Sequence, residues 1–265
     1  MCLIALAWRL QPRYPLVIAA NRDEDHARAT APAAIDPDAP SVYGGRDLVQ
    51  GGGWLKVSTQ GRLAAVTNVR TGLDAGAAPR SRGWLVRDFV RGNASAHGFA
   101  SALMDTADAY GPFNLLAFDG EALHVASNRP RPSQAQVEPG LHAMSNGAFD
   151  AEWPKSMRAT QALGTWLESL DAQDGPRPGP DLLDPLFVAL ADTTVAPDGA
   201  LPDTGIGLEL ERTLSPPFIR GERYGTRCST VVLAGHDGFV FAERRFGPGG
   251  RVLGTSEAFV PRAGP

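Results

Sequence analysis

The sequence has few cysteines, and the two that it has, Cys2 and Cys228, lie far apart in the chain. Because no CxxC pair is present, the sequence does not predict a zinc site of the cysteine type. Two cysteines also cannot build the disulfide framework of a small secreted domain, which favours the reducing cytoplasm. The five histidines show no metal-ligand spacing. We therefore expect a cytoplasmic protein that contains no metal site.

Long apolar runs and basic clusters are absent as well. Arg9 interrupts the apolar start of the chain, and neither a basic n-region nor a cleavage site marks a signal peptide. No later run reaches the roughly 20 residues that a membrane span needs. The net charge of −4 and the scattered arginines disfavour a nucleic-acid surface. We expect a small-molecule partner, no nucleic acid and no membrane span, and the sequence indicates no oligomeric state.

The order of the expected elements indicates the fold class. A chain of 265 residues with 43% apolar residues can bury a large core, and we expect residues 1–265 to form a single domain. Strands at both ends with helices between them predict an α+β fold, in which helices cover antiparallel sheets. Strands are expected at 2–7, 16–20, 54–57, 62–69, 114–118, 121–127, 142–145, 229–234 and 239–246, helices after an N-cap at Ser81 and at 95–108, 156–170 and 181–190, and loops at 31–40 and 174–180.

The position of Cys2 suggests a chemical role. A small residue at position two normally permits removal of Met1, which would leave one residue with both a thiol and a free α-amine. Such an amine can act as the base for a nucleophile on the same residue. Its reference pKa of about 7.7–8 gives a useful unprotonated fraction near neutral pH. The alternative is that Cys2 only begins a buried strand, since free cysteine behaves as a small hydrophobe.

The polar segment 21–24, Asn-Arg-Asp-Glu, follows the second expected strand. A hairpin of the first two strands would bring this segment beside Cys2. Arg22 would then lower the pKa of the thiol, and Asp23 would hold the α-amine. The alternative is a solvated turn, in which asparagine and aspartate are common.

Several short motifs occur in an order that resembles the NRDE family, whose eukaryotic members are called transport and Golgi organisation protein 2. The resemblance spans nearly the whole chain and implies the four-layer αββα sandwich of the N-terminal nucleophile hydrolases. Within that superfamily the sequence is most similar to the cholylglycine hydrolase and penicillin V acylase branch. The motifs are Cys2, NRDE at 21–24, TNVR at 67–70, FNLL at 113–116, SNGAFDAEWPK at 145–155 and GTR at 225–227.

The resemblance implies a catalytic role for each matching residue. Cys2 matches the nucleophile, and Asp23 matches the aspartate that contacts its amine. Asn68 and Asn146 match two active-site asparagines, of which Asn68 would donate to the oxyanion. Arg227 matches a late arginine near the nucleophile. Amide donors stabilise negative charge on the substrate oxygen, and a nearby cation keeps a thiolate ionised. The alternative for both asparagines is a satisfied polar residue at a strand end.

One departure from the acylases concerns their arginine before the aspartate. That position holds Ala20 here, and Arg22 lies two residues further on. On an extended strand a shift of two keeps the same face, so Arg22 could substitute with a different reach. We assign ligand contacts to Asn21, Arg22, Arg70 and Trp54.

Two functions remain open at this point. The first is a cysteine amidohydrolase that needs no cofactor and cleaves the C–N bond of a small acyl amide through a Cys2 acyl-enzyme. The second, implied by the family, is a non-catalytic haem or acyl-lipid binding and trafficking protein that uses the same cleft. The sequence has neither a Cys-Pro haem motif nor a histidine pair, so Cys2 or a nearby histidine would be the axial ligand.

Overall fold

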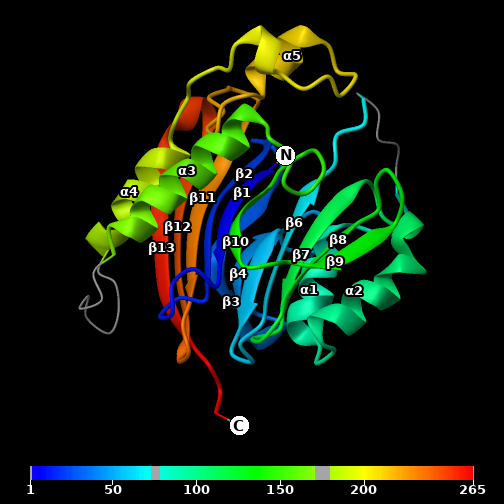
Figure 1. The fold of residues 1–265 in the computed structure, drawn as a ribbon, viewed down its shortest axis with the longest axis vertical. Helices are drawn as coiled ribbons and strands as arrows, with labels where there is room; N and C mark the ends of the chain where they lie inside the picture. Colours follow the sequence, from blue (N-terminus) through cyan, green and yellow to red (C-terminus); the bar gives the residue numbers. More distant parts are fainter. Residues whose placement is uncertain (1, 73–77, 171–179, 265) are drawn as a thin grey trace.

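The computed structural model describes residues 2–72, 78–170 and 180–264. In these ranges two antiparallel β-sheets pack face to face, and helices cover the outer face of each sheet (Figure 1). The layers follow the order α, β, β, α, so the expected α+β sandwich is confirmed. No helix in these ranges is long and apolar enough to span a bilayer.

The first sheet has six strands and carries both chain-end segments. Its outer face is covered by α3 (Pro154–Glu168) and α4 (Pro180–Leu190). In spatial order its strands are β10 (Gly140–Met144), β1 (Cys2–Trp8), β2 (Leu16–Asp25), β11 (Tyr224–Ala234), β12 (Gly238–Phe246) and β13 (Val252–Pro261).

The second sheet has seven strands, and α1 (Gly83–Arg91) and α2 (Ala96–Met104) pack on its outer face. A short helix, α5 (Leu208–Thr213), lies across the end of the sandwich at which β1 begins (Figure 1). In spatial order the strands are β3 (Thr30–Asp36), β4 (Ala39–Asp47), β5 (Leu55–Ser58), β6 (Leu63–Asn68), β7 (Phe113–Phe118), β8 (Leu123–Ser127) and β9 (Ser133–Gln136).

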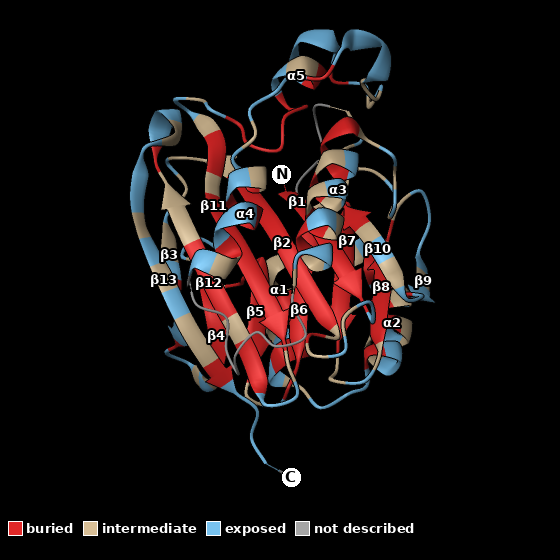
Figure 2. Cartoon of the chain, turned by 60° about the vertical axis from the view of Figure 1, so that its left-hand side comes forward, coloured by how far each residue is buried: buried red, intermediate tan, exposed pale blue. Residues whose placement is uncertain are grey.

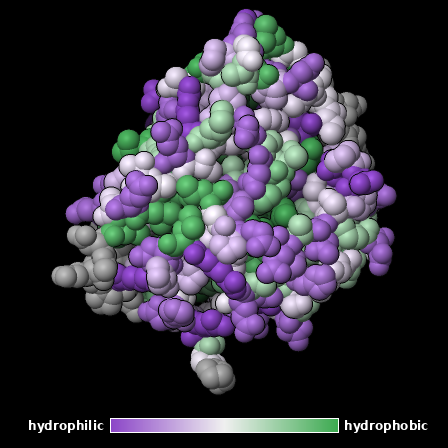
Figure 3. Space-filling view, in the orientation of Figure 1, coloured by the Kyte–Doolittle hydropathy of each residue, from purple (hydrophilic) through white to green (hydrophobic). Residues whose placement is uncertain are grey.

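Strand β1 is buried on both faces, which explains its continuous apolar sequence (Figure 2). Alternate side chains point to opposite faces of a strand. Cys2 and Ile4 therefore join the core between the sheets, whereas Leu3 and Ala5 pack beneath α3 and α4. This alternation directs the Cys2 thiol into the space between the two sheets. On the face drawn in Figure 3, polar side chains predominate and apolar ones gather mainly near α3.

The hairpins predicted from their turn residues are confirmed, including those at Asp119–Gly120 and Asp237–Gly238. The prediction of a loop at 31–40 is wrong, because this segment contributes to strands β3 and β4. Pro32 is tolerated since β3 is an edge strand whose register shifts between Ala31 and Ala34. Strands β9 and β13 were not predicted, because both are largely exposed edges without an apolar run. The expected loop at 174–180 lies almost entirely outside the described residues.

Two helix starts differ in detail from the sequence pattern. The N-cap of α1 is Arg82 rather than Ser81, although the Ser81 hydroxyl accepts a hydrogen bond from the Gly83 amide at 3.3 Å. Ser95 caps α2 by accepting from the Gly98 amide at 3.0 Å. This helix ends at Met104 rather than near 108, and a 3₁₀ turn follows it.

The second strand also continues further than predicted. Instead of ending at Ala20, β2 runs through the Asn-Arg-Asp-Glu segment to Asp25, paired with β11 along its length. A solvated turn at this segment is therefore excluded, and both Asn21 and Asp23 are buried. Polar side chains here lie within a central strand, which requires each of them to find a partner.

Candidate functional site

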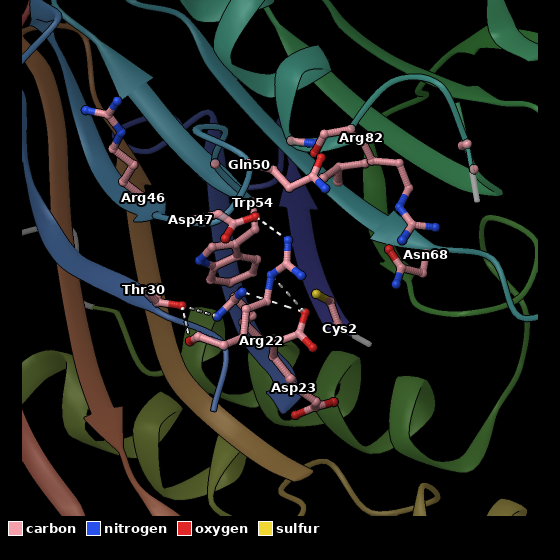
Figure 4. Close-up of a pocket in the computed structure, with 18 of the residues that line it drawn as sticks. Cys2, Arg22, Asp23, Thr30, Arg46, Asp47, Gln50, Trp54, Asn68 and Arg82 are labelled. Atoms are coloured by element: carbon pink, nitrogen blue, oxygen red, sulfur yellow. Dashed lines mark hydrogen bonds and ion pairs between the residues drawn. The ribbon is translucent and has the colours of Figure 1, made fainter. Parts of the chain in front are cut away.

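A cavity of about 280 Å³ opens at the end of the sandwich where β1 begins. Both sheets contribute to its lining, and the Cys2 sulfur lies among the polar side chains drawn in Figure 4. Five of the residues singled out from the sequence line it, namely Cys2, Arg22, Asp23, Trp54 and Asn68. The cavity is thus the place where five of the nine predicted site residues meet.

Strand register places Arg22 directly opposite Cys2. The two side chains therefore share one face, as expected for an arginine shifted by two positions from Ala20. Arg22 donates to the Thr30 hydroxyl at 3.4 Å and lies 3.8 Å from a Glu24 carboxylate oxygen. Burial raises the pKa of the Cys2 thiol, and the positive charge of Arg22 opposes this rise. Asp23 and Glu24 raise the thiol pKa further.

Asp23 lies one residue beyond Arg22, beside the N-terminal end of β1. It is only 1% exposed, and its carboxylate accepts a hydrogen bond from the Thr226 hydroxyl at 2.7 Å. Burial raises the pKa of this carboxyl group, whereas the charge of Lys155 and the Thr226 hydrogen bond lower it. The register thus brings a buried carboxyl group to the end of the strand that carries the thiol.

The two asparagines occupy different places. The Asn68 side chain lines the cavity at the end of β6. Asn146 is fully buried behind it and donates to the Asn68 carbonyl oxygen at 2.9 Å. The side-chain oxygen of Asn146 accepts from the Lys155 ammonium at 3.3 Å. Asn146 therefore supports the strand end that presents Asn68 rather than facing the cavity itself.

Hydrogen bonds connect the three central sequence motifs behind the cavity. Thr67 donates to the Ser145 carbonyl oxygen at 2.6 Å, and Asn114 donates to that of Gly147 at 2.8 Å. A Cβ atom at Gly147 would lie 2.7 Å from the Trp153 ring, so only glycine fits this close approach. The motifs at 67–70, 113–116 and 145–155 thus form one cluster that fixes the loop after β10.

Two predicted ligand contacts are not brought to the cavity. Asn21 points to the opposite face of β2, where its amide donates to the carbonyl oxygens of Leu190 and Pro217, both at 2.8 Å. Arg70 is engaged in an ion pair with Glu211 at 2.5 Å. Both side chains tie surrounding segments to the sandwich, and neither lines the cavity that contains Cys2.

Arg227 also lies elsewhere. The register between β11 and β2 shifts between Thr226 and Cys228, which places Arg227 in a β-bulge. Its guanidinium donates to the carbonyl oxygens of Asp25 at 2.9 Å and Arg28 at 3.0 Å. It lines a second cavity, so the expectation of an arginine at this position beside the nucleophile is not met.

Cys228 lies opposite Arg22 on the other side of β2. It is therefore two strands away from Cys2, a separation of about 9–10 Å between Cα atoms. A disulfide bond requires a closer approach, and both thiols are free. Burial raises the pKa of Cys228 well above its ordinary value, which is typical of an inert buried thiol.

Sequence reasoning missed most of the positive charge at the site. Five arginines and three carboxylates line the cavity, which gives an excess of cations that favours anionic groups on a ligand. These arginines are scattered in the sequence, so no local pattern signals their convergence. They are Arg22, Arg28, Arg46, Arg80 and Arg82, and the carboxylates are Asp23, Glu24 and Asp47.

Lys155 was also missed, although it ends a quoted motif. It is 2% exposed, and burial lowers its pKa to about 8, while the charge of Asp23 acts to raise it. The sequence draws attention to Lys155 only through the rarity of lysine, since Lys56 and Lys155 are the only two lysines in the chain.

Comparison with known proteins agrees with this architecture. The family model described as Transport and Golgi organisation 2 matches residues 1–248. The Transport and Golgi organization protein 2 homolog of Homo sapiens is 30% identical and is aligned over 92% of each chain. The Bos taurus homolog is 31% identical with the same coverage.

Among solved structures, penicillin V acylase from Agrobacterium tumefaciens matches with a TM-score of 0.51 and 11% sequence identity. The match covers 91% of this chain and 82% of the acylase. The structural match shows a common fold, that of the N-terminal nucleophile hydrolases. Sequence identity this low does not transfer an activity. The family model, in contrast, spans nearly the whole sequence. The chain therefore belongs to the Transport and Golgi organisation 2 family.

Proposed function

We propose that the protein is a cysteine amidohydrolase that cleaves the C–N bond of a small acyl amide once removal of Met1 has freed the Cys2 amine. The observation that carries this proposal is that Cys2, Asp23 and Asn68 all line one cavity. A nucleophile, a group that holds its amine and an amide donor are the parts that such a reaction needs.

In the proposed reaction the α-amine of Cys2 accepts the thiol proton, and the sulfur attacks the carbonyl carbon of the substrate. The carbonyl oxygen becomes negatively charged, and the Asn68 amide donates a hydrogen bond to it. The C–N bond then breaks, and the leaving amine takes the proton from the α-amine. Water next attacks the thioester, which releases the carboxylic acid and restores the thiol.

The environment of Cys2 makes an adjacent base necessary. Burial raises the pKa of the thiol, so little thiolate would form at neutral pH without help. A free α-amine has a reference pKa of about 7.7–8 and would lie on the same residue. The fully buried Asn146 holds the Asn68 backbone, which keeps the proposed oxyanion donor in place.

The test combines mass spectrometry with a substrate panel. Intact-mass measurement is expected to find the chain without Met1, and the wild type is expected to hydrolyse at least one acyl amide in a broad panel. Cys2→Ser should lose this turnover, whereas the matched control Cys228→Ser should keep it. A retained Met1, or no turnover of any amide by the wild type, would count against hydrolysis.

The excess of arginines supports a second candidate, in which the cavity binds haem or an acyl lipid without cleaving it. Both ligands carry anionic groups that arginine side chains can bind. Among the lining residues in the described ranges, Cys2 has the side chain best suited to ligate haem iron. A haem titration followed at the Soret band tests this, with Arg82→Gln as the variant expected to weaken binding. An unchanged Soret band would remove haem from consideration.

A further inference from the structure

Lys155 is buried at the start of α3, and its ammonium group contacts the Asn146 side chain that supports Asn68. It is the second residue of α3, which begins at Pro154, a residue favoured in the first turn of a helix. The ammonium group donates to the side-chain oxygen of Asn146 at 3.3 Å and to the Leu214 carbonyl oxygen at 3.4 Å. Both acceptors are neutral, so these contacts alone do not balance the charge.

The charged groups that face Lys155 come from four parts of the chain. They are Asp23 of β2, Cys2 of β1, Arg70 after β6 and Glu211 of α5. Arg70 and Glu211 form an ion pair with each other at 2.5 Å and largely compensate one another. Asp23 and, when ionised, Cys2 therefore remain as the negative groups that Lys155 can stabilise.

Other cations at the site do not fill this place. Arg227 lines the second cavity, and Arg82, whose charge interacts with Cys2, lines the first cavity from the start of α1 rather than from α3. Arg22 lies opposite Cys2, but Glu24 at 3.8 Å offsets part of its charge. Burying an ammonium group without a charged partner costs free energy. Titratable groups in such environments concentrate at functional sites.

We propose that Lys155 is a positioning residue that holds Asp23 as a carboxylate and Cys2 as a thiolate, and that orients Asn146 behind Asn68. This inference rests on the proposed role of Cys2 as the nucleophile. It extends that role by assigning the stabilising cation to α3 rather than to the arginine on β11.

The reactivity of the Cys2 thiol tests this inference without any substrate. Alkylation of Cys2 by iodoacetamide is measured against pH in a Cys228→Ser background. Lys155→Met is expected to lower the rate about tenfold near pH 7.5, since loss of the cation raises the thiol pKa by about one unit. The whole pH profile should shift to higher pH, and Lys155→Arg should restore most of the reactivity.

Two further variants separate charge from packing. Lys155→Gln keeps a donor for Asn146 without the charge, and it is expected to react as slowly as Lys155→Met. Arg158→Met removes one positive charge from the exposed side of the same helix, and its profile should match the parent. A Lys155→Gln profile that coincides with the parent would overturn the proposal. This readout also applies if Lys155→Met does not fold.

Comparison with turnover distinguishes this inference from the proposed hydrolysis. If no amide is cleaved but Lys155→Gln still shifts the alkylation profile, the inference stands and hydrolysis falls. If the wild type cleaves an amide and Lys155→Gln leaves both the alkylation profile and the pH profile of kcat unchanged, the inference falls and hydrolysis stands.

Discussion

The only two lysines of the chain, Lys56 and Lys155, are 1% and 2% exposed, yet their charges are balanced in different ways. Lys56 on β5 donates to Asp36 at 2.9 Å, and Arg91 contacts the other oxygen of this carboxylate at 3.0 Å. Lys155 forms no ion pair with any residue in the described part of the chain. Lys56 is thus a buried charge with a direct carboxylate partner. The carboxylate whose charge opposes the burial of Lys155, Asp23, lines the cavity instead.

The pKa values follow the same division. Burial lowers the pKa of Lys56, and the hydrogen bond and charge of Asp36 counteract it. Burial acts to raise the pKa of Asp36, but the Lys56 hydrogen bond and charge outweigh it and hold this pKa at about 2. For Lys155, burial lowers the pKa to about 8, against the opposing charge of Asp23. Lys56 thus has its counter-charge within the sheet, whereas the charge that opposes the burial of Lys155 belongs to Asp23 at the candidate site.

The largest expected effect comes from breaking the compensated pair. Lys56→Met leaves the buried Asp36 carboxylate with Arg91 as its remaining ion-pair partner, whose side chain is 30% exposed, and should lower the free energy of unfolding by about 3 kcal/mol. Denaturant unfolding measures this loss. The alkylation profile of Cys2 should stay unchanged under native conditions, because Lys56 is paired with Asp36 and does not line the cavity that contains the thiol. A loss below about 1 kcal/mol would contradict the structural assignment of Lys56.

Acid should weaken the same pair. The pKa of Asp36 falls from its usual 3.8 to about 2 in the folded state, so the unfolded state binds more protons between these values. The stabilisation is present above pH 3.8 and is lost as the pH falls through 2. It amounts to about 2 kcal/mol. Unfolding measured from pH 6 to pH 2 should show a steeper decline for the parent than for Asp36→Asn, and equal slopes would refute the assignment.

Loss of the other lysine should have a smaller effect on stability. The folded state lowers the pKa of Lys155 from 10.5 to about 8, so its charged form is disfavoured there. This cost is fully present below pH 8 and diminishes as the pH rises toward 10.5. Lys155→Met removes the cost together with two hydrogen bonds, and the free energy of unfolding at pH 7 should change by less than about 1 kcal/mol. A decrease above about 2 kcal/mol would assign Lys155 to the fold instead.

The smallest effect is expected for Arg158→Met, the charge control on α3. Arg158 and Asp192 lie 3.6 Å apart, and each side chain is about one-third exposed. Such surface pairs contribute less than about 0.5 kcal/mol, because solvent screens them. Thermal unfolding should leave this variant close to the parent. A large shift in its melting temperature would mean that any charge lost from α3 disturbs the protein.

The layers of the fold and the position of Cys2 could be predicted because they depend on local sequence signals. Short apolar runs and turn residues such as Asp119–Gly120 are local signals. The hairpin of β1 and β2 then brought Arg22 and Asp23 beside Cys2, as expected. Edge strand β3 was missed because Pro32 reads as a loop residue, whereas an irregular edge tolerates it.

The remaining parts of the site depend on contacts that no local pattern reveals. A single-residue bulge in β11 turns Arg227 away, and sequence spacing does not record bulges. Lys155 reaches the site only because the start of α3 packs against the loop that holds Asn146. The cavity arginines come from separate strands and loops, so their shared location required the folded chain.

Strand β1 begins at the cavity, whereas β13 ends at the far end of the sandwich (Figure 1). An affinity tag or fusion partner attached ahead of Cys2 would have to thread past the cavity mouth and would cap the amine chemically. The same appendage attached after β13 would remain well away from it. Recombinant protein carrying its purification handle at the carboxyl end is therefore the appropriate material for every assay of this thiol.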